Sequence, residues 1–140
     1  MVDTYQQNIS HSSEASTTND SWQTVKSEPL NISNGEIIYL DGMGICGEIK
    51  GASSGYPGRG RGVIRMINPE NNLVSNQYAT PTIRSDNTNF DKEYSYGNIG
   101  EYLQGDGWNY EFQLQLRSQS DGYTAAIRNV DSRLIARKIL

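Results

Sequence analysis

The 140-residue sequence is short of cysteine, histidine and long apolar segments: it has one Cys, one His and 35% apolar residues. A single cysteine excludes an intrachain disulfide. We expect Cys46 to be a buried structural thiol, because alternation over residues 43–49 places it among core positions and free cysteines usually pack as small hydrophobic groups. No apolar run approaches the roughly 20 residues of a membrane-spanning helix, so no membrane partner is expected.

The scarcity of histidine bears on catalysis. The only histidine, His11, lies in a polar segment, so a Ser-His-Asp or Cys-His arrangement would require that segment to fold back on the domain. Two carboxylate pairs, Asp91 with Glu93 and Asp106 with Glu111, have the residue types of a glycosidase site. Solvation of surface carboxylates explains these pairs more simply. We therefore expect no catalytic residues and no enzymatic activity.

The charge balance is acidic, with 16 Asp and Glu residues against 12 Lys and Arg, and a net charge of −4. Nucleic-acid-binding domains usually carry a basic surface, so no nucleic-acid partner is expected. The Gly-Arg alternation over residues 58–62 resembles an arginine-glycine element, but two arginines make only a small basic patch. We interpret this segment as a solvated hairpin loop whose Arg59 and Arg61 are available for ion pairs with a neighbouring subunit.

The hydrophobic pattern favours an all-β fold. The chain has 14 glycines, and no segment has the sustained period of a helix. Short alternating segments recur at the spacing typical of all-β domains, which predicts an antiparallel β-sandwich, jelly-roll-like, of about eight strands. Residues 51–62 are expected to form a long loop, and residues 73–84 are ambiguous because Pro81 interrupts them. The expected strands are residues 22–26, 36–41, 43–50, 63–67, 94–103, 110–117, 123–131 and 133–140.

Residues 1–20 form a separate polar segment of low complexity. This segment has few side chains to bury, so we expect an extended N-terminal arm that gains order on binding a partner. The predicted organisation is therefore a polar arm over residues 1–20 and a β-sandwich domain over residues 21–140.

Two further motifs resemble ligand-binding sites. Residues 42–47 have the G-x-G-x-x-G spacing of dinucleotide-binding turns, but a helix must begin there to hold a pyrophosphate, and residues 48–55 cannot sustain one. We therefore expect no cofactor. The acidic segment 86–93 is rich in oxygen ligands, although it lacks the glycine of an EF-hand loop and has Phe90 at a ligand position. We predict no metal site, and calcium binding by residues 86–93 stays open.

Aromatic side chains are concentrated over residues 94–110. Rings of this kind stack on sugars or anchor protein interfaces, because they bring a large contact area with few rotatable bonds. Their alternative role is sheet packing, since Tyr and Trp favour strands. The candidate sugar-binding residues are Tyr94, Tyr96, Tyr102 and Trp108.

The C-terminal part of the chain, residues 108–131 and 133–140, resembles the closing strands of jelly-roll modules in bacteriophage virion proteins of the head-decoration, head-fibre and tail-fibre types. The shared features are an alternating strand that ends in Leu116-Arg-Ser118, a small-residue turn, Thr124-Ala-x-Ile127-Arg-Asn129 and a last basic-apolar strand. The polar segment before Trp22 also resembles the entry to the first strand of those modules. The resemblance implies a non-enzymatic virion component.

Our first hypothesis is therefore a structural accessory protein of a phage virion, a capsid-decoration or fibre-like subunit that docks through its N-terminal arm. Its partners would be other virion proteins and further copies of the chain, with a trimer favoured, since such modules cover exposed sheet edges by oligomerising. The first residues lack the features of a signal peptide, so the expected location is the virion, assembled in the host cytoplasm. The expected partner contacts are Tyr5, Ile9, Trp22, Arg59 and Arg61.

The second hypothesis is a carbohydrate- or receptor-binding β-sandwich module. In that case a host-surface glycan would lie across the aromatic residues of segment 94–108. A third hypothesis is a capsid or surface-layer protein that assembles by itself.

Overall fold

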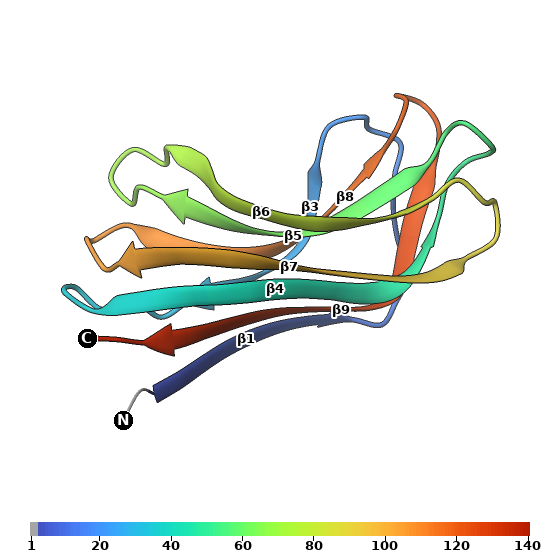
Figure 1. Cartoon of the computed structure of the whole chain (residues 1–140). Coiled ribbons are helices and arrows are strands. Elements are labelled where there is room, and N and C mark those ends of the chain that lie inside the picture. The colour runs from blue at the N-terminus through green and yellow to red at the C-terminus, as the bar shows by residue number, and fades with distance from the viewer. Residues whose placement is uncertain (1–2) are drawn as a thin grey trace.

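The structure is a computed structural model that describes residues 3–140, with the side chains of residues 7–79 and 81–140. Its described part consists of nine strands joined by turns and loops (Figure 1). None of the described residues forms a helix with the length and apolarity needed to cross a membrane. The strands are β1 (Asp3–His11), β2 (Ala15–Thr17), β3 (Gln23–Leu30), β4 (Ile37–Lys50), β5 (Gly58–Ile67), β6 (Val74–Ser85), β7 (Asp91–Gln104), β8 (Asn109–Ser118) and β9 (Ala125–Lys138).

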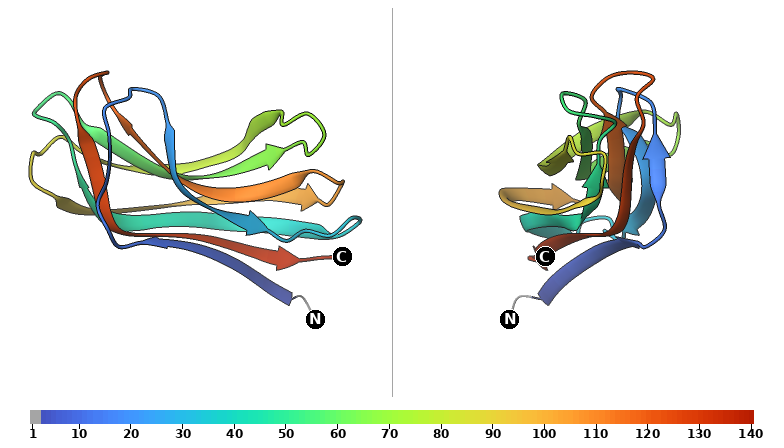
Figure 2. Two further views of the ribbon diagram at one scale, coloured as in Figure 1. Left: turned by 180° about the vertical axis from the view of Figure 1, so that it is seen from behind. Right: turned by 90° about the vertical axis from the view of Figure 1, so that its right-hand side faces the viewer.

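The strands form two antiparallel sheets that pack face to face (Figure 2). Sheet A has the order β1-β9-β4-β7, with β2 also paired to β9, and sheet B has the order β3-β8-β5-β6. The pairing is nested along the chain, because β1 and β2 pair with β9, β3 with β8, β4 with β7, and β5 with β6. First-with-last pairing spread over two sheets is the arrangement of a jelly roll. The predicted all-β, antiparallel, jelly-roll-like sandwich is thereby confirmed.

One face of each sheet is buried between the two layers. In β8 the apolar side chains of the predicted alternation, including Phe112, Leu114 and Leu116, are fully buried. In sheet A, β4 and β9 contribute alternating residues to the same core. Burying one such side chain stabilises the fold by roughly 1.5–3 kcal/mol. The residues of β4 and β9 in this core are Ile38, Leu40, Met43, Ile45, Ile49, Ala125, Ile127, Val130, Leu134 and Ala136.

The structure corrects the prediction of a free N-terminal arm over residues 1–20. β1 pairs with β9 from Asp3–Lys138 to His11–Val130, and β2 pairs with the first residues of β9. The single apolar side chain of Ile9 is fully buried in the core. A polar sequence suffices for an edge strand of this kind, because a long partner strand supplies the hydrogen-bond ladder. The predicted domain boundary at residue 21 therefore divides one sandwich.

Several strand boundaries also differ from the prediction. The two strands expected over residues 36–50 are one strand, β4, whose pairing with β7 and β9 shifts at a bulge between Leu40 and Gly42. Likewise, residues 125–138 form the single strand β9. The ambiguous segment with Pro81 is β6, and its place at the edge of sheet B explains why proline is tolerated there.

The Gly-Arg alternation begins strand β5 and does not form part of a loop. A Cβ atom at Gly58 would lie 2.5 Å from the backbone oxygen of Lys50, and one at Gly62 would lie 2.6 Å from the hydroxyl of Ser132. Glycine is thus needed where the inner face of β5 meets sheet A. The intervening Arg59 and Arg61 project from the outer face, because side chains alternate along a strand.

The position of β1 predicts a stability effect. We expect Ile9→Ala to lower the free energy of unfolding by about 2–5 kcal/mol, because it removes a fully buried side chain from the core. Urea denaturation followed by tryptophan fluorescence measures the change. The control is Ser13→Ala, an exposed position between β1 and β2, which should leave stability unchanged. Equal stability of both variants would mean that β1 is not part of the cooperative fold.

Candidate functional site

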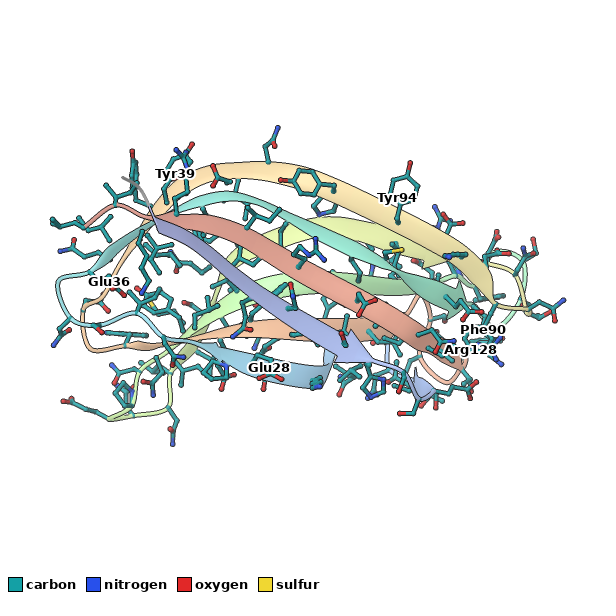
Figure 3. All side chains as sticks on the ribbon, turned by 90° about the horizontal axis from the view of Figure 1, so that it is seen from below. Glu28, Glu36, Tyr39, Phe90, Tyr94 and Arg128 are labelled. Atoms are coloured by element: carbon teal, nitrogen blue, oxygen red, sulfur yellow. The ribbon has the colours of Figure 1, made fainter. Side chains whose placement is uncertain are left out.

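Exposed tyrosines gather on the outer face of sheet A. Tyr94, Tyr96 and Tyr102 project from the edge strand β7 with exposed fractions of 82%, 53% and 62%. Tyr39 of the neighbouring strand β4 is paired with Tyr102. Figure 3 looks onto this sheet and labels Tyr39 and Tyr94. We call these four residues the tyrosine surface. Sequence reasoning missed Tyr39, although its alternation with buried Ile38 and Leu40 would have placed it on this face.

One end of the tyrosine surface is held by aromatic and ionic contacts. The rings of Tyr39 and Tyr102 meet edge to face with centroids 4.9 Å apart. The Arg137 guanidinium lies over the Tyr39 ring, 4.8 Å from its centroid, and its Nη2 is 3.0 Å from the carboxylate of Asp41. These contacts restrict the rotamers of the rings, which lowers the entropy cost of binding a partner.

The other end is shaped by two glycines of the motif at residues 42–47. A Cβ atom at Gly42 would collide with the hydroxyl of Tyr96, and one at Gly44 would lie 3.2 Å from the Tyr96 ring. The ring of Tyr96 therefore lies across β4, in space that only glycine leaves open. The G-x-G spacing thus serves aromatic packing within a continuous strand, as expected from the absence of a following helix.

A shallow hollow of about 350 Å³ lies beside Tyr96. Cys46 lies in it and is exposed, so the prediction of a buried thiol is wrong. Its neighbours Ile45 and Gly47 take the inward positions, which gives the cysteine the outward phase of the alternation. The lining residues are Gly44, Ile45, Cys46, Tyr94, Ser95, Tyr96, Asp131 and Arg133.

Trp108 does not belong to the tyrosine surface. It is partly buried against the core just before β8 of sheet B, and it borders a small hollow with Asn68, Pro69 and Asp106. Three of the four predicted sugar-binding residues are therefore together, and the tryptophan is a packing residue of the other sheet.

The predicted partner-contact residues Trp22, Arg59 and Arg61 lie at the outer face of sheet B. The Arg61 guanidinium lies over the Trp22 ring, 4.2 Å from its centroid, and Arg61 Nε donates a hydrogen bond to Gln115 Oε1 at 2.9 Å. Two further arginines, Arg84 and Arg117, flank Arg59 in the sheet register. Sequence reasoning missed both, because they come from distant segments.

The remaining predicted contacts are at the N-terminus. Ile9 is buried and so is not available to a partner. The backbone of Tyr5 pairs with Ala136 of β9, and its side chain lies outside the described residues.

His11 is part of strand β1 and so belongs to the folded domain, but its side chain does not meet the neighbouring serine and aspartate. Ser10 Oγ donates a 2.6 Å hydrogen bond to Asp131 Oδ1. His11 is the next residue of β1, so its side chain projects from the opposite face of the strand. The described residues therefore bring no Ser-His-Asp arrangement together here.

In the acidic segment 86–93, the carboxylate of Asp91 closes a turn. Asp91 Oδ2 accepts hydrogen bonds from Ser85 Oγ at 2.6 Å and from Asn87 Nδ2 at 2.8 Å. These bonds hold the pKa of the Asp91 carboxyl below its ordinary value, chiefly through Ser85. Across the described residues, no three His, Cys, Asp or Glu side chains group in a way that could hold a metal ion.

Comparisons with known proteins find structures of similar architecture but assign the chain to no family. No family model and no curated protein matches the chain. Among solved structures, it is similar to the Eiger TNF of S. frugiperda, at 10% identity and a TM-score of 0.48, over 99% of this chain and 93% of that one. It is also similar to the infectious bursal disease virus Gt strain, at 9% identity and a TM-score of 0.49, over 99% of this chain and 38% of that one.

A third similar structure is the CBM22-1 xylan-binding domain of Xyn10C from Paenibacillus barcinonensis. It shares 10% identity at a TM-score of 0.41, over 91% of this chain and 85% of that one. At such identities the likenesses concern the β-sandwich architecture alone. The bacteriophage part of the resemblance drawn from the sequence stays a prediction.

The hydrogen bonds of Asp91 predict a pH effect on stability. Because the folded pKa lies below the unfolded one, the stabilisation is present above about pH 4 and is lost as the pH falls through the folded pKa. We expect the melting temperature of Asp91→Asn to fall less steeply in acid than that of the wild type. Asp121→Asn, at an exposed turn, is the control and should follow the wild-type curve. Parallel curves for all three proteins would contradict the prediction.

Proposed function

We propose that this chain is a non-enzymatic structural subunit of a bacteriophage virion, of the capsid-decoration or fibre type. The observation that carries the proposal is the tyrosine surface, three of whose four rings, those of Tyr94, Tyr96 and Tyr102, are exposed on an edge strand of the sandwich. Contiguous exposed aromatic surface marks interaction sites in soluble proteins. The resemblance of residues 108–140 to closing strands of phage jelly-roll modules supports the virion setting.

The partner that we propose for the tyrosine surface is a second copy of the same chain. β7 is an edge of sheet A, and an edge strand carries unpaired backbone groups that oligomerisation covers. Tyrosine suits such an interface because its ring buries apolar area while its hydroxyl keeps a hydrogen-bonding group. A closed ring of three copies is the expected state. With β1 held in sheet A, docking through a free N-terminal arm is no longer part of the proposal.

A second candidate function, carbohydrate binding, is favoured by the hollow beside Tyr96. There a ring fixed over Gly42 and Gly44 lies next to the polar side chains of Asp131 and Arg133. A flat ring with neighbouring charged hydrogen-bonding groups is the chemistry that recognises a sugar.

The two candidate functions predict different masses in solution. We expect the wild-type chain to have three times its 15.6 kDa mass by light scattering, and the double variant Tyr94→Ser, Tyr102→Ser to be monomeric. Loss of the two rings removes the apolar area that holds the copies together. The control is Tyr123→Ser, an exposed tyrosine stacked on Tyr56 away from the tyrosine surface, which should remain trimeric.

A wild-type chain that is monomeric at every concentration would overturn assembly through the tyrosine surface. If that monomer binds a glycan array and Tyr96→Ala abolishes the signal, the carbohydrate hypothesis replaces it. Circular dichroism of each variant verifies that the sandwich is intact.

A further inference from the structure

A row of three arginines crosses the outer face of sheet B. Arg59 of β5 is paired with Arg84 of β6 on one side and with Arg117 of β8 on the other. Directly opposed residues of antiparallel strands project from the same face, with Cβ atoms about 4.5–5.5 Å apart. We call these three residues the arginine row. Arg61, two residues along β5, adds a fourth cation to the same face.

None of the carboxylates in the described part of the chain forms an ion pair with the arginine row. Arg59 Nε donates to Gln119 Oε1 at 3.2 Å, and Arg117 Nη1 donates to the backbone carbonyl of Asp20 at 3.1 Å. The four ion pairs found among the described residues involve other cations. In addition, Arg117 Nε is buried without a hydrogen-bond partner. The positive charge of the row is therefore not compensated by an ion pair, and the Arg117 Nε donor has no acceptor.

This arrangement is costly for the isolated chain. Like charges directly opposite each other in a sheet are destabilising. Burial, together with the charges of Arg84 and Arg117, lowers the pKa of the Arg59 guanidinium. Glu111 is a carboxylate on the same face, but in the strand register it lies opposite Arg65, six residues and about 20 Å along β5 from Arg59. A bound anion would relieve the repulsion and fill the free donors.

We propose that the arginine row binds an acidic segment of a partner protein, whose carboxylates lie in the forks of the guanidinium groups. Arginine presents parallel N–H donors that match a carboxylate in a bidentate manner. Neighbouring strands are about 4.8 Å apart, so the row spans about 10 Å. That span suits two or three carboxylates of a short peptide segment.

A nucleic acid or sulfated polysaccharide fits the row less well. Either polymer would extend beyond the row onto the surface of a chain with a net charge of −4. Single-stranded nucleic acids also need free rings on which bases stack. Trp22 is not free in this sense, because the guanidinium groups of Arg61 and Arg117 lie over it at 4.2 and 5.3 Å.

This site goes beyond the proposed assembly function, and it uses the other sheet. The tyrosine surface belongs to sheet A and the arginine row to sheet B. Failure of one proposal therefore leaves the other untouched, and the variants that test them share no residue.

The test is binding of a fluorescent oligo-glutamate peptide to the full chain, measured by anisotropy at low ionic strength. We expect Arg59→Gln and Arg84→Gln each to weaken binding about tenfold or more, because each removes a charge-assisted contact. The matched control is Arg128→Gln, which makes the same change in net charge but removes a guanidinium that already lies 3.3 Å from the Glu48 carboxylate. Its affinity for the peptide should equal that of the wild type.

Three outcomes would overturn the proposal. The first is a wild-type chain that binds none of the probes. The second is equal weakening of peptide binding by all three variants, which would indicate general charge attraction. The third is Arg59-dependent binding of dextran sulfate or oligothymidylate without binding of the peptide, which would exclude a protein partner. A second measurement guards against unfolding: without peptide, Arg59→Gln should melt no lower than the wild type, since the substitution relieves repulsion.

Discussion

The jelly roll depends on the pairing of its last strand with its first ones. β9 lies between β1 and β4 in sheet A and also pairs with β2, so three partners share one strand. Sheet A is therefore incomplete until the C-terminal residues have formed their ladder. Pairing between the two ends of a chain is also the most costly in loop-closure entropy, which makes such folds slow to form. Ile9 of β1 is buried in the core that this pairing closes.

The middle of β9 shows how one strand serves these partners. The strand pairs with β1 through residues 130–138 and with β2 through residues 125–127. Between them Asn129 has a positive φ of 47°, and the register with β4 shifts between Cys46 and Glu48. Glu48 accepts hydrogen bonds from Asn129 Nδ2 at 2.6 Å and Arg128 Nη2 at 3.3 Å, which lower the pKa of its carboxyl. A local carboxylate thus supports the bulge that lets β9 change partners.

Period-2 alternation made the sandwich predictable wherever the inward residue is a large apolar side chain. Residues 110–117 are the clear case, because Phe112, Leu114 and Leu116 mark the buried face. The same period was hidden at residues 58–62, the first half of β5, where glycines take the inward positions and the segment was interpreted as part of a loop. It was also misjudged at Cys46, although the buried side chains of Met43, Ile45 and Ile49 mark the inward positions and place residue 46 outward. β1 escaped prediction because an edge strand needs few apolar residues of its own.

The candidate sites were predictable only as far as they are local in sequence. Tyr94, Tyr96 and Tyr102 come from one strand, so sequence spacing brought them together, whereas Tyr39 is placed beside them by the β4–β7 ladder. The arginine row is the extreme case, because its members come from three separate strands and meet only through register. No periodicity within a single segment carries that information.

The two outer faces differ in a way that constrains how copies of the chain can meet. On sheet A the cations Arg128 and Arg137 are paired with Glu48 and Asp41, so their charges are compensated within the chain. On sheet B a twofold contact would bring one arginine row against another, since an isologous interface places the same patch on both sides. Such a contact buries like charges without compensation, at a high desolvation cost. The arginine row therefore disfavours twofold self-association through sheet B and favours the acidic partner proposed for it, whereas on sheet A Arg128 and Arg137 already have carboxylate partners within the chain.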